Sequence, residues 1–417
     1  MTAGDSDVET RRRPPDSGED ESGEALMDIA TVRRWAVVAL LVGHGLIHLL
    51  GVARGFGWAE VPQLGHSIGA GGGVLWLLAA VLVLVSAVLI AAESTTWWWL
   101  IALSGAAVSQ IAIASSWGQA GGGTLVNVLL VVVAVYGFLS VGPTSLHAQW
   151  QRQAAAALTH ADPAPALLTE TDLHDLPPPL AAYLRRSGAI GRPRVTSLHA
   201  DFHGRIRSGP HAAWMPFTGE QVNTFGPRPQ RMFIMDATRS GLPVTVLHSY
   251  LDATATMRAK VLSVVTVVDA AGAEMDRGET VTVFNDLVVL APGAIVDAPI
   301  RWTEIDDRHV RGVFTNGDQQ VTAVLTFDGD ADLVDFVSDD RLRASTDGTS
   351  CTQQRWSTPL SGHREAQGLR VLTSGEGRWD APGQGGWFTY VELHFDAIVH
   401  NIHNLDATAE PLLVRQP

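Results

Sequence analysis

The stretch between Trp35 and Gly142 constrains the fold of this chain more than any other feature. Within it only Arg54, Glu60 and Glu93 carry a formal charge. The whole chain is 17% charged, against about 25% in typical soluble proteins, and the deficit is concentrated here. The surface of a water-soluble domain cannot be built from so few charges. A wholly soluble protein is therefore excluded, and the sequence predicts an integral membrane protein.

Four apolar runs in this stretch are each long enough to cross a bilayer. They cover residues 35–53, 70–92, 97–117 and 121–141, and about 20 residues of helix span a hydrocarbon core. A single segment crosses lipid only as a helix, because its backbone polar groups must be satisfied within the segment. We therefore expect a four-helix transmembrane bundle over residues 31–142. The residues assigned to the membrane include Trp35, Gly51, Val74, Ala91, Trp97, Ser116, Thr124 and Val141.

The distribution of arginines predicts the orientation of this bundle. Arg33 and Arg34 precede the first span, further arginines follow the fourth, and Arg54 is the only basic residue in the connections. Because positively charged flanks stay in the cytoplasm, we expect a multi-pass protein of the cell membrane with both termini cytoplasmic. The single cysteine, Cys351, fits a reducing compartment. It also excludes an intramolecular disulfide framework and any multi-cysteine metal site.

Two histidines on the first span are weak candidates for a metal site. His44 and His48 are four residues apart and therefore lie on one helix face. Ionisable side chains at membrane depth are functional candidates, so the pair could ligate a metal or haem or pass protons. The alternative, which we favour, is two neutral imidazoles bonded to neighbouring helices. Gln110 and Asn127 are also expected to bond between helices. We assign no metal and no cofactor.

The segments that flank the bundle differ in character. Residues 1–30 hold nine acidic residues and almost no large apolar ones, so we expect a disordered acidic tail. Residues 143–175 are expected to form a linker. Within it, apolar residues recur every four positions, at Leu146, Trp150, Ala154 and Leu158. This spacing is typical of a helix on a membrane surface and equally of a helix docked on the next domain. The net charge of −14 argues against nucleic-acid binding.

Residues 176–405 carry the signals of an antiparallel, β-rich domain, and residues 406–417 follow as a tail. Apolar residues alternate along several segments, and turn sequences such as Asn316-Gly317-Asp318 recur at hairpin spacing. A brief helix is expected at Leu180–Ser187 and a longer one at Thr280–Leu290. The fold class is therefore α+β and multidomain, with one large sheet that is curled or folded against a helix.

Several motifs of the chain resemble those of an uncharacterised bacterial membrane family. They are residues 44–51 (HGLIHLLG), 278–286 (GETVTVFND), 291–293 (APG), 302–306 (WTEID), 334–341 (VDFVSDDR) and 356–359 (WSTP). The resemblance extends from residue 35 to about 403. It implies a four-span region followed by a β-rich domain, and it implies no activity. The strand and turn pattern also resembles the half-barrel of bacterial lipoprotein carriers. That likeness implies a half-barrel-like fold, which alone does not give function.

Acidic and aromatic residues in or beside these motifs are the candidate site residues. Five carboxylates could support acid–base hydrolysis or could form structural ion pairs: Glu279, Asp286, Asp339, Asp340 and Glu376. A second set could line an apolar ligand pocket or pack in the core: Trp302, Arg341, Trp356 and Trp379, with Trp387 and Phe395 also facing inward. A nucleophilic cysteine is possible only at Cys351, in a loop rich in Thr, Ser and Gly.

Three functional hypotheses follow from these observations. The first is a membrane-tethered module whose cytoplasmic β domain binds an apolar or amphipathic, lipid-like ligand. The second is a hydrolase that uses the acidic residues of the β domain. The third is a structural or sensory membrane protein that meets an unidentified protein partner. We favour the first hypothesis, with the lipid bilayer and a lipid-like molecule as partners.

Overall fold

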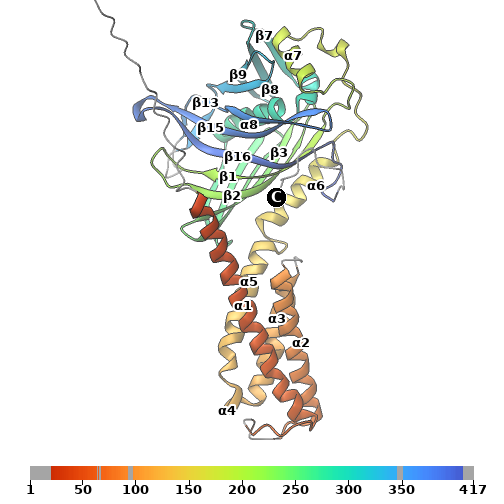
Figure 1. Cartoon of the computed structure of the whole chain (residues 1–417), viewed down its shortest axis with the longest axis vertical. Helices are drawn as coiled ribbons and strands as arrows, with labels where there is room; N and C mark the ends of the chain where they lie inside the picture. Colours follow the sequence, from red (N-terminus) through yellow and green to blue (C-terminus); the bar gives the residue numbers. More distant parts are fainter. Residues whose placement is uncertain (1–19, 63, 65–66, 93–96, 345–350, 407–417) are drawn as a thin grey trace, which may run out of the picture. The chain divides into compact units, whose positions relative to one another are not determined.

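The computed structural model describes residues 20–62, 64, 67–92, 97–344 and 351–406. The chain divides into two compact units, residues 1–134 and 135–417. Apolar helices come first and a curled antiparallel sheet follows (Figure 1), which confirms the expected α+β class. Residues 1–19 of the expected acidic tail lie outside the described residues. The first helix begins at Asp20.

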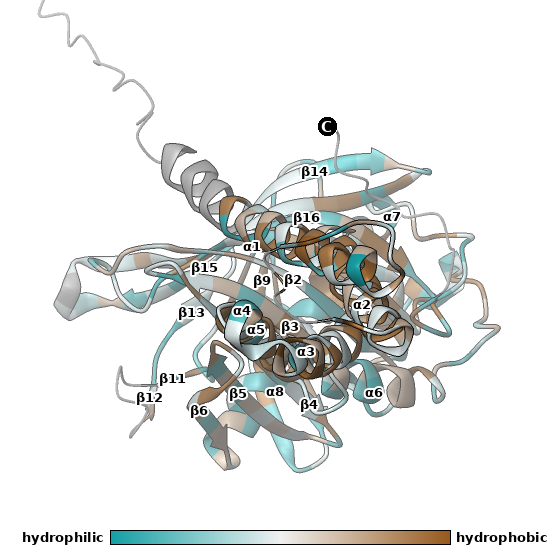
Figure 2. Ribbon diagram, turned by 90° about the horizontal axis from the view of Figure 1, so that it is seen from below, coloured by the Kyte–Doolittle hydropathy of each residue, from teal (hydrophilic) through white to brown (hydrophobic). Residues whose placement is uncertain are grey.

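The first unit is helical. Its elements are α1 (Asp20–Gly55), α2 (Ala70–Ala92), α3 (Trp98–Ser115), α4 (Trp117–Ala120) and α5 (Gly123–Val141), the last of which runs into the second unit. Among the described residues, four segments are long and apolar enough to cross a membrane: Thr31–Gly55, Ala70–Ala92, Trp98–Ser115 and Gly123–Leu158. Figure 2 shows α2, α3 and α5 as largely hydrophobic. Trp97 precedes α3, and Ser116 follows it.

Small residues bring the helices of this unit close together. A Cβ atom built on Gly55 of α1 would lie 2.4 Å from the Cα of Gly73 in α2, so only glycine fits at this crossing. Farther along the bundle, alanines occupy many of the buried positions: Ala87, Ala102, Ala106 and Ala134. Helices in lipid pack by such close approach, because lipid tails supply no hydrophobic driving force between them.

The second unit contains a 14-stranded antiparallel sheet among the described residues. Its strands are β1 (Ser197–Ile206), β2 (Met215–Thr224), β3 (Gln230–Arg239), β4 (Leu242–Leu251), β5 (Thr254–Val261), β6 (Val265–Ala271), β7 (Ile300–Glu304), β8 (His309–Asn316), β9 (Gln319–Phe327), β10 (Leu333–Ser338), β13 (Trp356–Ser357), β14 (Leu360–Ala366), β15 (Leu369–Ala381) and β16 (Gly386–His400). A separate ladder joins β11 (Leu342–Ala344) to β12 (Cys351–Gln353).

The strand order shows how the sheet forms a half-barrel. It runs β6-β5-β4-β3-β2-β1-β16-β15-β13-β10-β9-β8-β7, and β14 pairs with β15 outside this path. The pairing of β1 with β16 joins two arms: the first, β1–β6, is a run of consecutive hairpins, and the second holds β7–β10, β13 and β15–β16. The helix α8 (Ala273–Leu290) contacts β4, β5 and β6 of one arm and β9, β10 and β15 of the other. The sheet therefore curls around α8.

The core of this unit forms where α8 meets the second arm. Phe284 of α8 is fully buried, and its ring centre lies 5.3 Å from that of Phe314 and 5.2 Å from that of Phe336. The helix α7 (Pro178–Arg186), which agrees closely with the brief helix expected from the sequence, joins this core. Its Tyr183 hydroxyl donates to the Val288 carbonyl of α8 at 2.8 Å.

The helix α8 begins seven residues before the expected Thr280. Its first turn contains the exposed Glu274 and the half-buried Asp276. Acidic residues stabilise the positive end of a helix dipole, but they give no apolar periodicity. The apolar pattern starts only at Val281, which is why the sequence predicted a shorter helix.

The helix α6 (Leu146–Leu158) is docked on the sheet, which was one of the two alternatives for the linker. Its apolar face packs on Val222, Met232 and Leu247 of β2, β3 and β4, and the Trp150 indole donates to the Met232 carbonyl at 3.0 Å. Because strand side chains alternate between faces, the neighbouring residues of these strands point to the opposite, concave face, toward α8.

Candidate functional site

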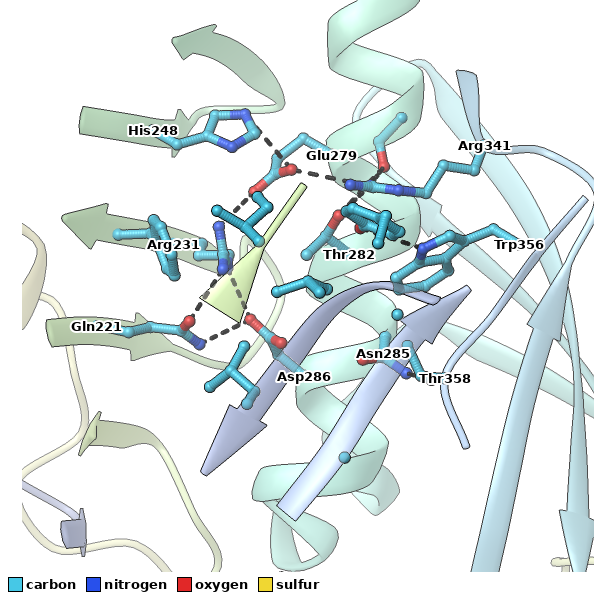
Figure 3. Close-up of a pocket in the computed structure, with 18 of the residues that line it drawn as sticks. Gln221, Arg231, His248, Glu279, Thr282, Asn285, Asp286, Arg341, Trp356 and Thr358 are labelled. Atoms are coloured by element: carbon cyan, nitrogen blue, oxygen red, sulfur yellow. Dashed lines mark hydrogen bonds and ion pairs between the residues drawn. The ribbon is translucent and has the colours of Figure 1, made fainter. Parts of the chain in front are cut away.

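The half-barrel contains a cavity of about 390 Å³ between α8 and the concave face of the sheet. Pockets that bind small molecules in proteins have volumes of about 300–1,000 Å³. The walls come from β1–β5, from α8 and from β11–β16 (Figure 3). They have an apolar part and a polar part.

The apolar part is built mainly from strand residues. On the first arm it consists of Ile206, Phe217, Phe233, Met235, Val246 and Met257. On the second arm, aromatic and aliphatic side chains face them: Trp356, Leu372, Trp379, Tyr390, Leu393 and Phe395. Most of the wall can therefore contact a hydrocarbon or ring system, whose transfer from water is favourable by about 25 cal/mol per Å².

The polar part follows one face of α8. Glu279, Thr282, Asn285 and Asp286 recur at spacings of three and four residues, so they share that face. Asn285 donates to the Thr358 hydroxyl at 2.6 Å. Arg231 of the first arm meets Glu279 and Asp286, and Arg341, between β10 and β11, donates to the Thr282 hydroxyl (Figure 3).

Arg231 of β3 is the centre of this polar cluster. Its guanidinium donates to Glu279 Oε1 and to Asp286 Oδ2, both at 2.8 Å, and to Gln221 Oε1 at 2.9 Å. The Arg231 side chain is only 8% exposed. Two buried carboxylates thus share one buried cation, which is stable only if every partner is in place.

The two carboxylates titrate in opposite directions. Burial raises the pKa of Asp286, although Arg231 and Asn223 oppose the effect. Burial also acts on Glu279, but its electrostatic interactions with His248, Arg231 and Arg341 outweigh burial and lower the pKa of Glu279. The cluster is therefore arranged to keep Glu279 ionised.

His248 and Arg341 approach Glu279 Oε2 from different elements. The Nε2 atom of His248 lies 3.4 Å away and the Nη1 atom of Arg341 lies 3.9 Å away. Arg341 also donates to the Gly278 carbonyl at 2.5 Å and stacks 4.7 Å from the ring centre of Trp356. Among the described residues, neither His248 Nε2 nor Arg341 Nε has a hydrogen-bond partner, although both atoms are buried.

Most of the candidates named from the sequence meet at this cavity. Lining residues include Glu279, Asp286, Glu376, Arg341, Trp356, Trp379 and Phe395. Trp302 does not line the cavity. It packs on the far side of α8, with its ring centre 5.9 Å from that of Phe284.

The remaining acidic candidates have structural partners. Asp339 is largely exposed and lies 3.3 Å from the Arg355 guanidinium. Asp340 accepts hydrogen bonds from Arg277 and from the Thr322 backbone amide. Neither lines the cavity.

Glu376 lines the cavity but is held by its own neighbours. It accepts hydrogen bonds from Arg378 at 2.8 Å and from the Thr389 hydroxyl at 2.7 Å. These bonds, with burial acting in the opposite sense, lower its pKa.

Two expectations about individual residues are wrong. Trp387 was expected to face inward, but it is 45% exposed near the start of β16. Cys351 was expected in a loop, but it pairs with Ala344 in a short β ladder. Burial raises the pKa of the Cys351 thiol, and Glu274 adds to the effect.

Sequence reasoning missed Arg231, His248 and Gln221. Arg231 lies directly before an apolar run, Met232 to Met235. A charged residue at the start of a buried strand needs a buried partner. This pattern could have indicated that Arg231 forms a buried ion pair. His248 and Gln221 gave no such signal, since their position beside α8 depends on the curl of the sheet.

The histidines of α1 form an interhelical hydrogen-bond network. The Nε2 atoms of His44 and His48 lie 3.2 and 2.8 Å from the Ser109 hydroxyl of α3, and His44 also lies 3.2 Å from Asn127 Oδ1 of α5. Asn127 bonds in turn to Gln110 at 3.0 Å. These bonds join α1 to α3 and α5 through both Nε2 atoms, while His48 Nδ1 is buried without a hydrogen-bond partner among the described residues.

A cluster with metal-ligand spacing lies on the opposite face of β1 and β2. The ligand atoms of His199, Asp201 and Glu220 all lie within 4.8 Å of one another. His199 Nε2 lies 3.3 Å from Glu220 Oε2, so the side chains already pair with each other. The cluster is separate from the cavity.

The comparisons with known proteins place the chain in a family. A family model described as a family of unknown function (DUF6544) matches residues 166–393, which is more than half of the chain. The chain belongs to this family. The match spans nearly all of the half-barrel and α8. No curated protein matches the chain.

Two solved structures show a distant likeness. A "putative outer membrane lipoprotein-sorting protein domain" from Vibrio parahaemolyticus is 8% identical, with 52% of this chain and 87% of that chain covered and a TM-score of 0.30. A DUF1329 family protein from Desulfovibrio piger is 10% identical, with 56% and 95% covered and a TM-score of 0.30. Neither likeness bears on the function of this DUF6544 chain.

Proposed function

We propose that the chain is a membrane-tethered protein whose half-barrel binds one apolar or amphipathic, lipid-like molecule. The cavity of about 390 Å³ with a largely apolar wall and one polar face carries this proposal. Protein interiors are close-packed and contain few voids larger than a water molecule. A cavity of this size is therefore not an ordinary packing defect of a core.

The distribution of polar atoms supports an amphipathic ligand. Along β4 the lining of the cavity changes from apolar at Val246 to polar at His248. Along β3 it changes from apolar at Met235 to charged at Arg231. The ligand's apolar part would lie against Val246 and Met235, and its polar group would lie against α8. There it would lie beside the side chains of His248 and Arg341, both of which line the cavity.

The tether in this proposal is the helical unit. Its four apolar segments have the length and composition of membrane spans. The arginines beside the first and last segments favour cytoplasmic termini, and the half-barrel would then face the cytoplasm. A membrane anchor keeps the cavity beside a bilayer, which is the main cellular source of apolar ligands.

A photoreactive fatty acid tests this proposal on the full chain in lipid nanodiscs. We expect cross-links on peptides that contain cavity residues such as Met235. The variant Val246→Trp fills the apolar part of the cavity, and a loss of about 1.4 kcal/mol of binding would reduce the cross-linking about tenfold.

Val324→Trp is the matched control for this experiment. Val324 is a half-buried strand valine on β9 that does not line the cavity, so its substitution should leave the cross-linking unchanged. Cross-links spread evenly over the protein surface, or equal cross-linking in both variants, would contradict the proposal.

A further inference from the structure

Two neighbouring hairpin turns form an exposed apolar edge of the half-barrel. We call this edge the rim and define it by the turns at 240–241 and 262–264 with five side chains: Leu242, Leu262, Val264, Val265 and Val267. Their exposed fractions are 45%, 39%, 59%, 55% and 54%. The two turns are adjacent, because the Leu262 amide donates to the Pro243 carbonyl at 2.9 Å.

We propose that the rim inserts into the interfacial layer of the lipid bilayer. This inference takes α5 to span the membrane, as in the proposed function, and adds a second attachment through the sheet itself. Three independent features of the described residues lead to it: the contact of the rim with α5, the charge of the rim, and its place relative to the cavity.

The first feature is a direct contact between the rim and the end of α5. The hydroxyls of Ser140 and Ser263 lie 2.9 Å apart. Ser140 is the second-last residue of α5, and Leu139 and Lys260 lie in the same small cluster of contacts. A membrane-spanning α5 ends at the bilayer surface, so Ser263 and its neighbours lie at that surface too.

The second feature is the charge of the rim. Residues 237–246 and 258–268 contain Arg239, Arg258 and Lys260 and no acidic residue, although the chain as a whole carries a net charge of −14. Lys260 is also the only lysine of the chain. Two acidic residues flank these segments: Asp269 lies 3.4 Å from Arg258, and Asp236 accepts a hydrogen bond from the Thr245 hydroxyl at 2.7 Å. Apolar side chains beside basic ones are typical of segments that bind the surface of anionic membranes.

The third feature is the position of the cavity relative to the rim. Val246 of the apolar wall is four residues from Leu242 on β4, and Met235 is four residues from Arg239 on β3. With the rim in the bilayer, the apolar part of the cavity is the part nearest to lipid. A ligand could then pass between the membrane and the cavity with its apolar part largely out of water.

Depth-dependent fluorescence quenching tests the insertion. The full chain carries Cys351→Ser and Val264→Cys, is labelled with a polarity-sensitive dye and is reconstituted in nanodiscs that contain anionic lipid. We expect blue-shifted emission and loss of most of the signal when the lipids carry a quencher near the head group. The control places the dye at Asp318→Cys, in the exposed turn between β8 and β9, where emission should be red-shifted and unquenched.

Unquenched emission from position 264 would overturn the inference. The inference would also be overturned if the protein, without nanodiscs, self-associated and shielded the dye at position 264 from water. A second copy of the chain at the β6 edge would then be the occupant of the rim. Neither result would affect the fatty-acid cross-linking of the cavity, so the two proposals fail separately.

Discussion

Replacing Arg231 with methionine is expected to lower the free energy of unfolding by about 3–5 kcal/mol. The substitution keeps much of the side-chain volume but leaves Glu279 and Asp286 buried without the cation that they share at 2.8 Å. An uncompensated buried charge is costly, while the intact pair itself contributes little net stability. Chemical denaturation of the full chain in detergent, followed by tryptophan fluorescence, measures the change.

Two further variants make this result specific to the charge cluster. Arg311→Met removes an exposed arginine of β8 and should change stability by no more than about 0.5 kcal/mol. Adding Glu279→Gln and Asp286→Asn to Arg231→Met should restore part of the loss, because no unpaired charge remains. Equal stability of the Arg231 and Arg311 variants would show that the cluster is not buried as described.

Acidification is expected to destabilise the half-barrel through His248. Burial lowers the pKa of His248 to about 4, with Arg231 and Arg341 acting in the same direction and Glu279 opposing them. The unfolded chain binds a proton at this histidine below its ordinary pKa of 6.5, and the native state does not until about pH 4. Stability therefore falls as the pH drops through this window. A pKa difference of this size corresponds to about 3 kcal/mol.

The variant His248→Gln isolates this contribution. It should flatten the dependence of unfolding free energy on pH between about 6.5 and 4, since glutamine does not titrate. Glu279, whose pKa is lowered, still loses its contribution as the pH falls through the acid range, whereas the raised pKa of Asp286 acts in the opposite direction. His211→Gln, at an exposed position, should keep the parent profile. A His248 variant with the parent profile would contradict the assigned burial.

Features that depend on residues close together in the sequence could be predicted, and features that depend on distant residues could not. The four apolar segments and the alternation along β1 and β9 depend on neighbours within a few residues, so periodicity was enough. The pairing of Leu198 with His400 joins positions about 200 residues apart. No local pattern encodes that pairing, and the half-barrel shape came from a resemblance to known folds.

The candidate site shows the same division. Glu279 and Asp286 were recognised because they lie in motifs of α8, but their shared partner, Arg231, lies on β3 of the first arm. Trp302 and Trp356 looked equivalent in the sequence. The register of the sheet places Trp356 at the cavity and Trp302 behind Phe284.

Native mass spectrometry of the full chain, extracted in mild detergent, tests the binding of a lipid-like molecule most directly. The account predicts one bound apolar or amphipathic molecule per chain, retained by Val324→Trp and absent from Val246→Trp. A parent protein with no bound molecule, when purified from its membrane and after incubation with lipid extract, would contradict it.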